Sequence, residues 1–132
     1  MEIKKEIIIV EDDNFQEKIF RKIISEISSD KDFFIVSFSR GAAAVEYIKE
    51  NCQKVGLVVM DLALPDLSGL EAIKNIKKIR SEIDIIALTA TEDKDIVVEA
   101  IKLGAKDYFV KGKNKEELER FFVSISNSLQ KD

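Results

Sequence analysis

The sequence has 132 residues, of which 45% are hydrophobic and 35% charged, as is typical of one globular domain with a sizeable core. Its net charge is −4 and its basic residues are spread along the chain, which argues against nucleic-acid binding, because that needs a concentrated basic surface. The chain has no histidine, which excludes histidine-dependent serine and cysteine catalysis, histidine-ligated zinc and a phosphate carried on histidine.

The first third of the chain predicts a strand, a helix, a strand and a second helix. Residues 3–10 are rich in isoleucine and valine, which favours a buried strand. Asn14 is expected to cap the next helix, with Glu17 completing a capping box. The apolar stripe of this helix consists of Phe15, Ile19, Phe20, Ile23, Ile24 and Ile27. A strand follows over 32–38, and the alanines of 41–51 favour a helix whose apolar stripe is thin.

The middle of the chain predicts a strand, a loop and a third helix. Residues 55–60 are almost entirely apolar, and Asp61 follows them at once. The only proline of the chain, Pro65, marks the loop. Ser68 and Glu71 are spaced as a capping box for the helix. The apolar stripe of this helix consists of Leu70, Ile73, Ile76 and Ile79.

The last third repeats the pattern twice. A strand is predicted over 83–88, directly before Thr89, and the helix after it is expected to end at Gly104. A short strand over 107–110 precedes Lys111. The final helix is expected to be capped by Asn114. The helix that ends at Gly104 is predicted over about 93–103. The apolar residues of the final helix are Leu118, Phe121, Phe122, Ile125 and Leu129.

Strand and helix thus alternate five times, which predicts an α/β fold: one doubly wound, five-stranded parallel sheet with five helices on its two faces. In such sheets a ligand site lies at the carboxyl ends of the strands. The polar residues that follow the strands directly are Glu11, Asp12, Asp13, Asp61, Thr89 and Lys111. These residues are distant in sequence, and the fold is expected to bring them to one edge of the sheet.

Clustered carboxylates without histidine or cysteine favour a hard, oxygen-binding cation such as Mg²⁺. Two carboxylates about 4 Å apart repel by roughly 4 kcal/mol at an effective dielectric constant near 20, and a divalent ion would offset this repulsion. Asp61 is then placed to act as a nucleophile toward phosphorus, giving an aspartyl phosphate. Lys111 and Thr89 are candidates to contact the phosphoryl oxygens.

The sequence resembles the response-regulator receiver domain of two-component signalling over essentially its whole length, 1–132. The resemblance rests on four segments and on their order along the chain: "IIIVEDD", "VVMDLALPDLSG", "IIALTA" and "LGAKDYFVKG". It implies a single-domain, flavodoxin-like fold with the strand order 2-1-3-4-5. It also implies a cytoplasmic signalling protein, which agrees with an apolar run near the start that is too short for a signal peptide or a membrane span.

The resemblance implies a role for each matching residue. Asp61 corresponds to the phosphoacceptor, and Glu11, Asp12, Asp61 and the backbone carbonyl of Ala63 correspond to the ligands of Mg²⁺, for which Mn²⁺ can substitute. Of the acidic pair, Asp12 is expected to bind the ion directly and Glu11 largely through water.

Three further positions follow from the same resemblance. Thr89 and Lys111 correspond to the pair that contacts the phosphate, and Thr89 and Tyr108 to the switch that changes the surface on phosphorylation. One departure is Gly112, where the family usually has a proline, often after a cis peptide bond. A cis bond to a residue other than proline costs about 2.5–4 kcal/mol, so a trans bond is expected.

The implied function is phosphoryl transfer from a histidine kinase or a phosphotransfer protein to Asp61, with a downstream output domain or protein reading the switch. The chain is thus expected to be a signalling domain that assists its own phosphorylation and dephosphorylation, not an enzyme. It is expected to be a monomer or weak homodimer, without direct nucleic-acid binding or membrane contact.

Two alternatives remain open. An unphosphorylated receiver-like interaction module would keep the fold alone, although Asp12, Asp61 and Lys111 are all present. A Mg²⁺-dependent phosphohydrolase of the haloacid-dehalogenase type would need a second aspartate two residues after Asp61, where this chain has Ala63.

Some of these residues are better explained by structure than by function. Asp13 is more consistent with a turn residue that favours the helix dipole than with a ligand. Phe121 and Phe122 are adjacent on the last helix, and both are expected to be substantially buried, although exposure of one would suggest a partner surface. Cys52 is the only cysteine, so it can form no internal disulfide.

Overall fold

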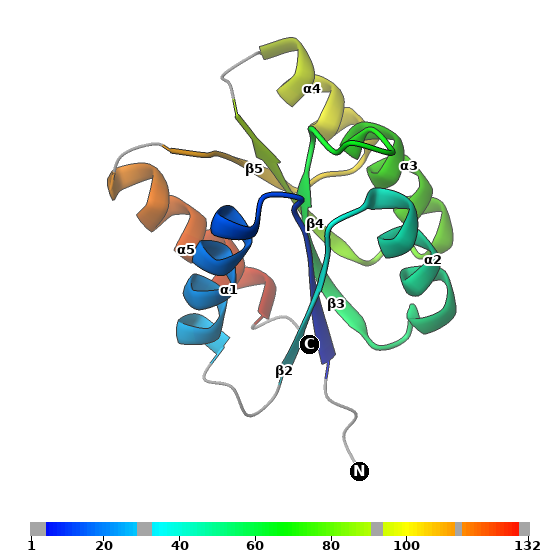
Figure 1. Ribbon diagram of the computed structural model, residues 1–132, viewed down its shortest axis with the longest axis horizontal. Coiled ribbons are helices and arrows are strands. Elements are labelled where there is room, and N and C mark those ends of the chain that lie inside the picture. The colour runs from blue at the N-terminus through cyan, green and yellow to red at the C-terminus, as the bar shows by residue number, and fades with distance from the viewer. Residues whose placement is uncertain (1–4, 29–32, 91–93, 113–114, 130–132) are drawn as a thin grey trace.

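The computed structural model describes residues 5–28, 33–90, 94–112 and 115–129, along which five strands and five helices alternate (Figure 1). The strands are β1 (Lys5–Val10), β2 (Phe33–Phe38), β3 (Val55–Asp61), β4 (Asp84–Thr89) and β5 (Asp107–Val110). The helices are α1 (Asn14–Ser28), α2 (Gly41–Asn51), α3 (Gly69–Ile79), α4 (Lys94–Leu103) and α5 (Lys115–Leu129).

The five strands form one parallel sheet in the order β2-β1-β3-β4-β5, which confirms the predicted fold class and strand order. Helices α1 and α5 cover one face of the sheet, and α2, α3 and α4 cover the other (Figure 1). None of the described helices is long and apolar enough to cross a bilayer.

The two faces of the sheet explain the continuous apolar runs of the sequence. Successive side chains of a strand point to opposite faces. Ile7 and Ile9 therefore pack with α1 and α5, whereas Ile8 and Val10 pack on the α2 and α3 side. All four are fully buried, because a parallel sheet covered on both faces needs apolar residues in both directions.

Aromatic rings anchor α5 to the sheet. The ring of Phe121 lies 4.6 Å from that of Phe109 and 5.5 Å from that of Phe20, measured between centroids. Phe121 is fully buried and Phe122 is half-buried, which agrees with the expectation for this pair. The next residue of α5, Val123, is the exposed hydrophobic side chain.

The predicted cap of α1 is wrong. Asn14 is the first helical residue, and the Oδ1 atom of Asp13 accepts hydrogen bonds from the backbone N–H groups of Phe15 (2.9 Å) and Gln16 (3.1 Å). Glu17 does not complete a capping box; its Oε2 accepts hydrogen bonds from Arg21 and from Ser37 of β2. Adjacent aspartate and asparagine can both cap a helix, and the sequence does not show which of them lies one residue before it.

The apolar stripe predicted for α1 holds only in part, because Phe15 and Ile19 are exposed. Three other predicted signals agree with the structure. Ser68 caps α3 by accepting from the backbone N–H of Leu70 at 3.2 Å. Gly104 follows α4 with a φ of +124°, as expected for a glycine after a helix end. The peptide bond before Gly112 is trans, as predicted. Residues 3–4, 32 and 93 and the predicted cap Asn114 lie outside the described residues.

Candidate functional site

The parallel sheet brings the carboxyl ends of its strands to one edge. Asp61 and Thr89 are the last residues of β3 and β4, and both are buried. Glu11 directly follows β1 and Lys111 directly follows β5. The backbone N–H of Lys111 donates to the carbonyl of Thr89 at 2.8 Å, which holds the lysine beside the end of β4. The predicted gathering of these residues is therefore confirmed.

Three carboxylates of this edge lie close together. Glu11, Asp12 and Asp61 each have an oxygen atom within 4.8 Å of the others. Glu11 and Asp61 are buried, whereas Asp12 is exposed. One open side and three carboxylate oxygens suit a hard divalent cation, which keeps several waters in its shell.

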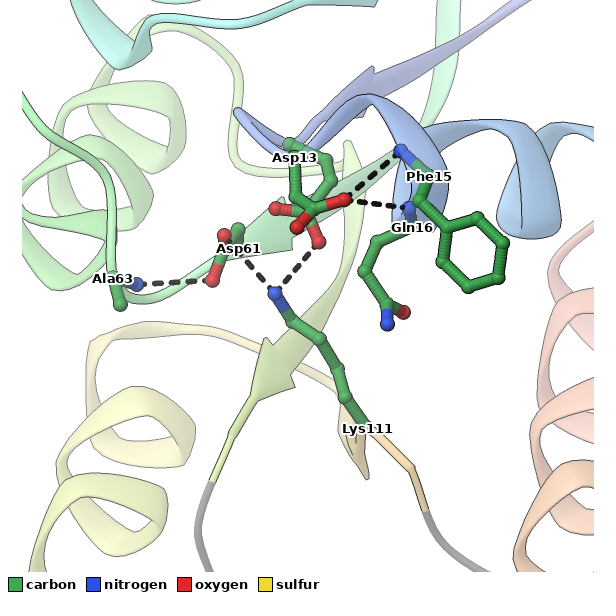
Figure 2. A network of polar contacts seen from close by, with 7 residues as sticks. Asp13, Phe15, Gln16, Asp61, Ala63 and Lys111 are labelled. Atoms are coloured by element: carbon green, nitrogen blue, oxygen red, sulfur yellow. Dashed lines mark hydrogen bonds and ion pairs between the residues drawn. The ribbon is translucent and has the colours of Figure 1, made fainter.

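Lys111 lies between the buried carboxylates of Glu11 and Asp61. Figure 2 shows its side chain pointing toward Asp61. Its Nζ atom is 2.6 Å from Oε1 of Glu11 and 3.1 Å from Oδ2 of Asp61. Burial opposes the charge of Lys111, but the hydrogen bond to Glu11 and the charges of both carboxylates outweigh it and raise the pKa of the lysine. Lys111 is therefore a fixed positive charge in contact with Asp61.

The lysine does not satisfy Glu11 completely. Burial, together with the neighbouring Asp61 carboxylate, raises the pKa of Glu11 to about 8, although Lys111 acts in the opposite direction. Within the described part of the chain, Oε2 of Glu11 is buried and has no hydrogen-bond partner. A buried carboxylate oxygen without a partner is unfavourable, and a cation or its bound water at this point would satisfy it. The residues present therefore fit a divalent metal ion.

The loop after β3 orients Asp61. The backbone N–H of Ala63 donates to Oδ1 of Asp61 at 3.0 Å, which directs the other oxygen, Oδ2, toward Lys111 (Figure 2). The far end of the loop returns to the same place: a Cβ atom on Gly69 would lie 2.3 Å from the carbonyl oxygen of Asp61. Only glycine fits here, so the loop closes tightly on the backbone of Asp61.

Asp13 is not part of the carboxylate cluster. Figure 2 shows its side chain turned toward Phe15 and Gln16, whose backbone N–H groups it accepts from. The structural interpretation of Asp13 is therefore confirmed, and the cap places α1 directly beside the site.

Tyr108 lies on β5 with a half-buried side chain. The Arg120 guanidinium stacks over its ring at 5.1 Å from the centroid and also pairs with Asp107 at 2.8 Å. This arrangement joins the predicted switch residue to α5. It went unpredicted, because sequence spacing does not show which residue of a helix faces a given strand.

A second contact that sequence reasoning missed involves Asp66. This residue lies in the loop between Asp61 and α3, and its carboxylate accepts hydrogen bonds from two backbone N–H groups at the start of α2. A loop aspartate 24 residues beyond its partner carries no sequence signal of this contact.

A surface hollow away from the carboxylates shows that cavity size does not identify the site. It has a volume of about 370 Å³ at the opposite edge of the sheet, where Lys5, Arg80 and Asp84 line it. Among the described residues around it, none is a predicted site residue. A smaller hollow of about 270 Å³ adjoins Glu11, between α1 and the end of β2. The chemistry of the side chains therefore identifies the site better than the size of a cavity.

Comparisons with known proteins agree with this geometry. The family model of the response regulator receiver domain matches residues 7–122. The chemotaxis protein CheY of Thermotoga maritima is 36% identical, over 81% of this chain and 85% of that protein, and CheY of Bacillus subtilis is 38% identical, over 80% and 83%. Among solved structures, a response regulator receiver domain protein from Clostridium thermocellum superposes with a TM-score of 0.79 at 25% identity, covering 96% of this chain and 94% of that one.

Proposed function

The chain belongs to the response regulator receiver domains of two-component signalling, and from this premise we propose that Asp61 accepts a phosphoryl group from a histidine of a kinase or a phosphotransfer protein. The observation that carries the proposal is the surroundings of Asp61: a buried carboxylate 3.1 Å from Lys111 and within reach of Glu11 and Asp12. The partners are the donor protein and a downstream output domain or protein.

In the proposed reaction a carboxylate oxygen of Asp61 attacks the phosphorus of the phosphohistidine. The phosphorus–nitrogen bond breaks, the electron pair returns to the imidazole, and that nitrogen takes up a proton. Mg²⁺, held by Glu11, Asp12, Asp61 and the backbone carbonyl of Ala63, would neutralise charge on the phosphoryl oxygens.

The chain's own residues supply the rest of the site. The N–H of Ala63 fixes one oxygen of Asp61, so that the carboxylate is oriented before the donor arrives. Lys111 already contacts Asp61 and can contact a phosphoryl oxygen without a large movement. The Thr89 hydroxyl, at the end of the neighbouring strand, is proposed to bind another phosphoryl oxygen.

Movement of Thr89 toward the phosphoryl group would leave space for Tyr108 to turn inward and change the surface near Arg120, which stacks on it. The chain has two tyrosines and no tryptophan, so a Tyr47→Phe variant reports Tyr108 fluorescence alone. We expect this fluorescence to change on phosphorylation. An unchanged signal in a fully phosphorylated sample would rule out the tyrosine switch and leave phosphoryl acceptance intact.

The central experiment is incubation with acetyl phosphate and Mg²⁺, followed by mass spectrometry. We expect a stable adduct of one phosphoryl group in the wild type and none in Asp61→Asn. Asp84→Asn is the matched control, because Asp84 is also buried at a strand end but on the opposite edge of the sheet. Steady hydrolysis of phosphate esters would favour a phosphohydrolase, and a lack of both adduct and turnover would favour an interaction module.

A further inference from the structure

The start of α2 is capped by a residue from another loop. Oδ1 of Asp66 accepts from the backbone N–H of Gly41 at 2.9 Å, and Oδ2 accepts from that of Ala42 at 3.0 Å. Arg40 occupies the helix's own cap position but makes no capping hydrogen bond with its side chain, and the first turn has no acidic residue. The N–H groups of Ala42 and Gly41 lower the pKa of the Asp66 carboxyl, which agrees with a charged cap.

The contact between α2 and this loop is also close on the apolar side. A Cβ atom on Gly41 would lie 3.0 Å from a methyl carbon of Leu64 and 3.2 Å from Cβ of Leu67. The start of α2 therefore packs against loop residues on both sides of Asp66. A residue larger than glycine at position 41 would push α2 away from the loop.

Asp66 is the anchor of the loop's outer part. At its base, the loop is held by the hydrogen bonds from Leu62 N–H to the Leu88 carbonyl (2.9 Å) and from Gly69 N–H to the Leu62 carbonyl (3.3 Å). Between the base and Asp66 lies Ala63, whose N–H orients the Asp61 carboxylate. A loop tied at both places holds the backbone of Ala63 in one position.

The same contact reaches the acidic pair. The start of α2 follows β2 closely, and the carbonyl of Phe38, the last residue of β2, accepts from the N–H of Glu11 at 3.0 Å. Asp66 thus connects the loop that carries Ala63 to the segment that holds the backbone of Glu11. Both sides of the carboxylate cluster are fixed relative to each other through α2.

We propose that Asp66 is a positioning residue of the phosphoacceptor site: by capping α2 from the loop after β3, it holds the backbone of Ala63 where it orients Asp61 and faces a metal ion. The inference rests on the proposed function for its metal, but the anchoring of Ala63 exists without it. An ordinary cap would stabilise α2 alone. In this proposal Asp66 also positions the loop that carries Ala63.

The test separates helix capping from loop anchoring. In Asp66→Ala both are lost. In the double variant Asp66→Ala with Arg40→Ser, a serine at the extended Arg40 position caps α2 locally, and the loop stays untethered. Arg40→Ser alone supplies the baseline. Tyr47→Phe is the matched control, because it removes a hydrogen bond between the same helix and Glu6, away from the loop.

We expect Asp66→Ala to lower the melting temperature and to weaken Mg²⁺ binding about tenfold by calorimetry, a typical effect for a residue behind the metal ligands. The double variant should regain the melting temperature but not the Mg²⁺ affinity. In metal-free protein, amide exchange at Ala63 should be faster in both Asp66 variants than in wild type and Tyr47→Phe.

Two results would overturn the inference: Mg²⁺ affinity restored together with the melting temperature in the double variant, or unchanged exchange at Ala63. A wild-type protein that binds no Mg²⁺ would refute the proposed function instead. In that case exchange at Ala63 without metal would still decide whether Asp66 anchors the loop.

Discussion

Lys111 Nζ lies 2.6 Å from Oε1 of Glu11, although the two residues are 100 positions apart. Both side chains are largely buried, and the same ammonium also contacts Asp61 at 3.1 Å. One positive charge therefore faces two buried carboxyl groups, and it can balance only one of them once both are ionised, above the raised pKa of Glu11 of about 8. The metal-free site is electrostatically incomplete, which is the physical basis for the predictions that follow.

Removing the Lys111 charge should destabilise the metal-free protein. Above the raised pKa of Glu11, Lys111→Met leaves two buried carboxylates without a cation, and we expect the free energy of unfolding to fall by about 3–5 kcal/mol, since breaking one side of a buried ion pair is costly. Urea denaturation with and without Mg²⁺ measures this loss, part of which the ion should restore. Lys106→Met is the control, because Lys106 is more exposed and lies 3.7 Å from Asp84. Equal losses in the two variants would contradict this account.

The pKa of Glu11 predicts an unusual pH dependence. Between about pH 4.5 and about pH 8, Glu11 holds a proton in the folded protein and loses it in the unfolded chain. The folded protein then binds more protons, so the free energy of unfolding should fall as the pH rises, by at most about 1.4 kcal/mol per pH unit. Lys111 has a raised pKa and acts above this window, whereas Glu17, Asp66 and Asp107 have lowered pKa values and act below it.

Urea denaturation in a chelator across this pH range measures the slope. Glu11→Gln should flatten it, because the amide cannot ionise. Glu82→Gln, at an exposed carboxyl, should leave it unchanged. A metal-free wild type whose stability is constant or rises with pH would show that Glu11 is ionised throughout the range.

The order of strands and helices could be predicted because the sequence patterns that mark each element lie within that element. The apolar runs that end at Val10 and Asp61 mark buried strands by composition, and alternation with helices leaves few arrangements besides a parallel sheet. The same topology brought Asp61 and Lys111 together without knowledge of either side chain's direction.

The contacts that sequence analysis missed depend on distant or directional partners. Asp66 caps a helix that precedes it by 24 residues, and Arg120 stacks on Tyr108 through the docking of α5. The error at Asn14 has another cause, because Asp13 next to it offers the same capping oxygen. Lys111 was expected to contact phosphate. Its contact with Glu11 could not be predicted from the sequence, because a long flexible side chain can reach several partners.

Mg²⁺ stabilisation should depend on Asp12 and not on Asp13. Asp12→Asn removes an exposed oxygen ligand and some repulsion, so the metal-free protein should gain up to about 1 kcal/mol and lose most of its response to the ion. Wild type at a Mg²⁺ concentration of 100 times its dissociation constant should gain about 2.7 kcal/mol. Asp13→Asn, a change in the cap of α1, should keep this response. Thermal unfolding with increasing Mg²⁺ measures both, and a full response in Asp12→Asn would exclude Asp12 as a ligand.

The lifetime of the phosphorylated protein should depend on the side chain at position 63. Ala63 is exposed directly beside Asp61, and its methyl group can neither orient nor deprotonate a water that attacks the phosphoryl group. We therefore expect self-dephosphorylation with a half-life of minutes or longer. Ala63→Asn adds a polar group at this point and should shorten the half-life by roughly tenfold, less than the roughly hundredfold or more that a positioned acid or base contributes, because an amide can orient water but cannot deprotonate it.

Loss of the mass adduct over time after removal of acetyl phosphate measures the half-life. Ala43→Asn adds the same side chain to an exposed alanine of α2 and should leave the rate unchanged. A wild-type half-life of seconds would mean that water is oriented by a group other than the side chain at position 63. In that case Ala63→Asn should have little effect, because the attacking water would already be held.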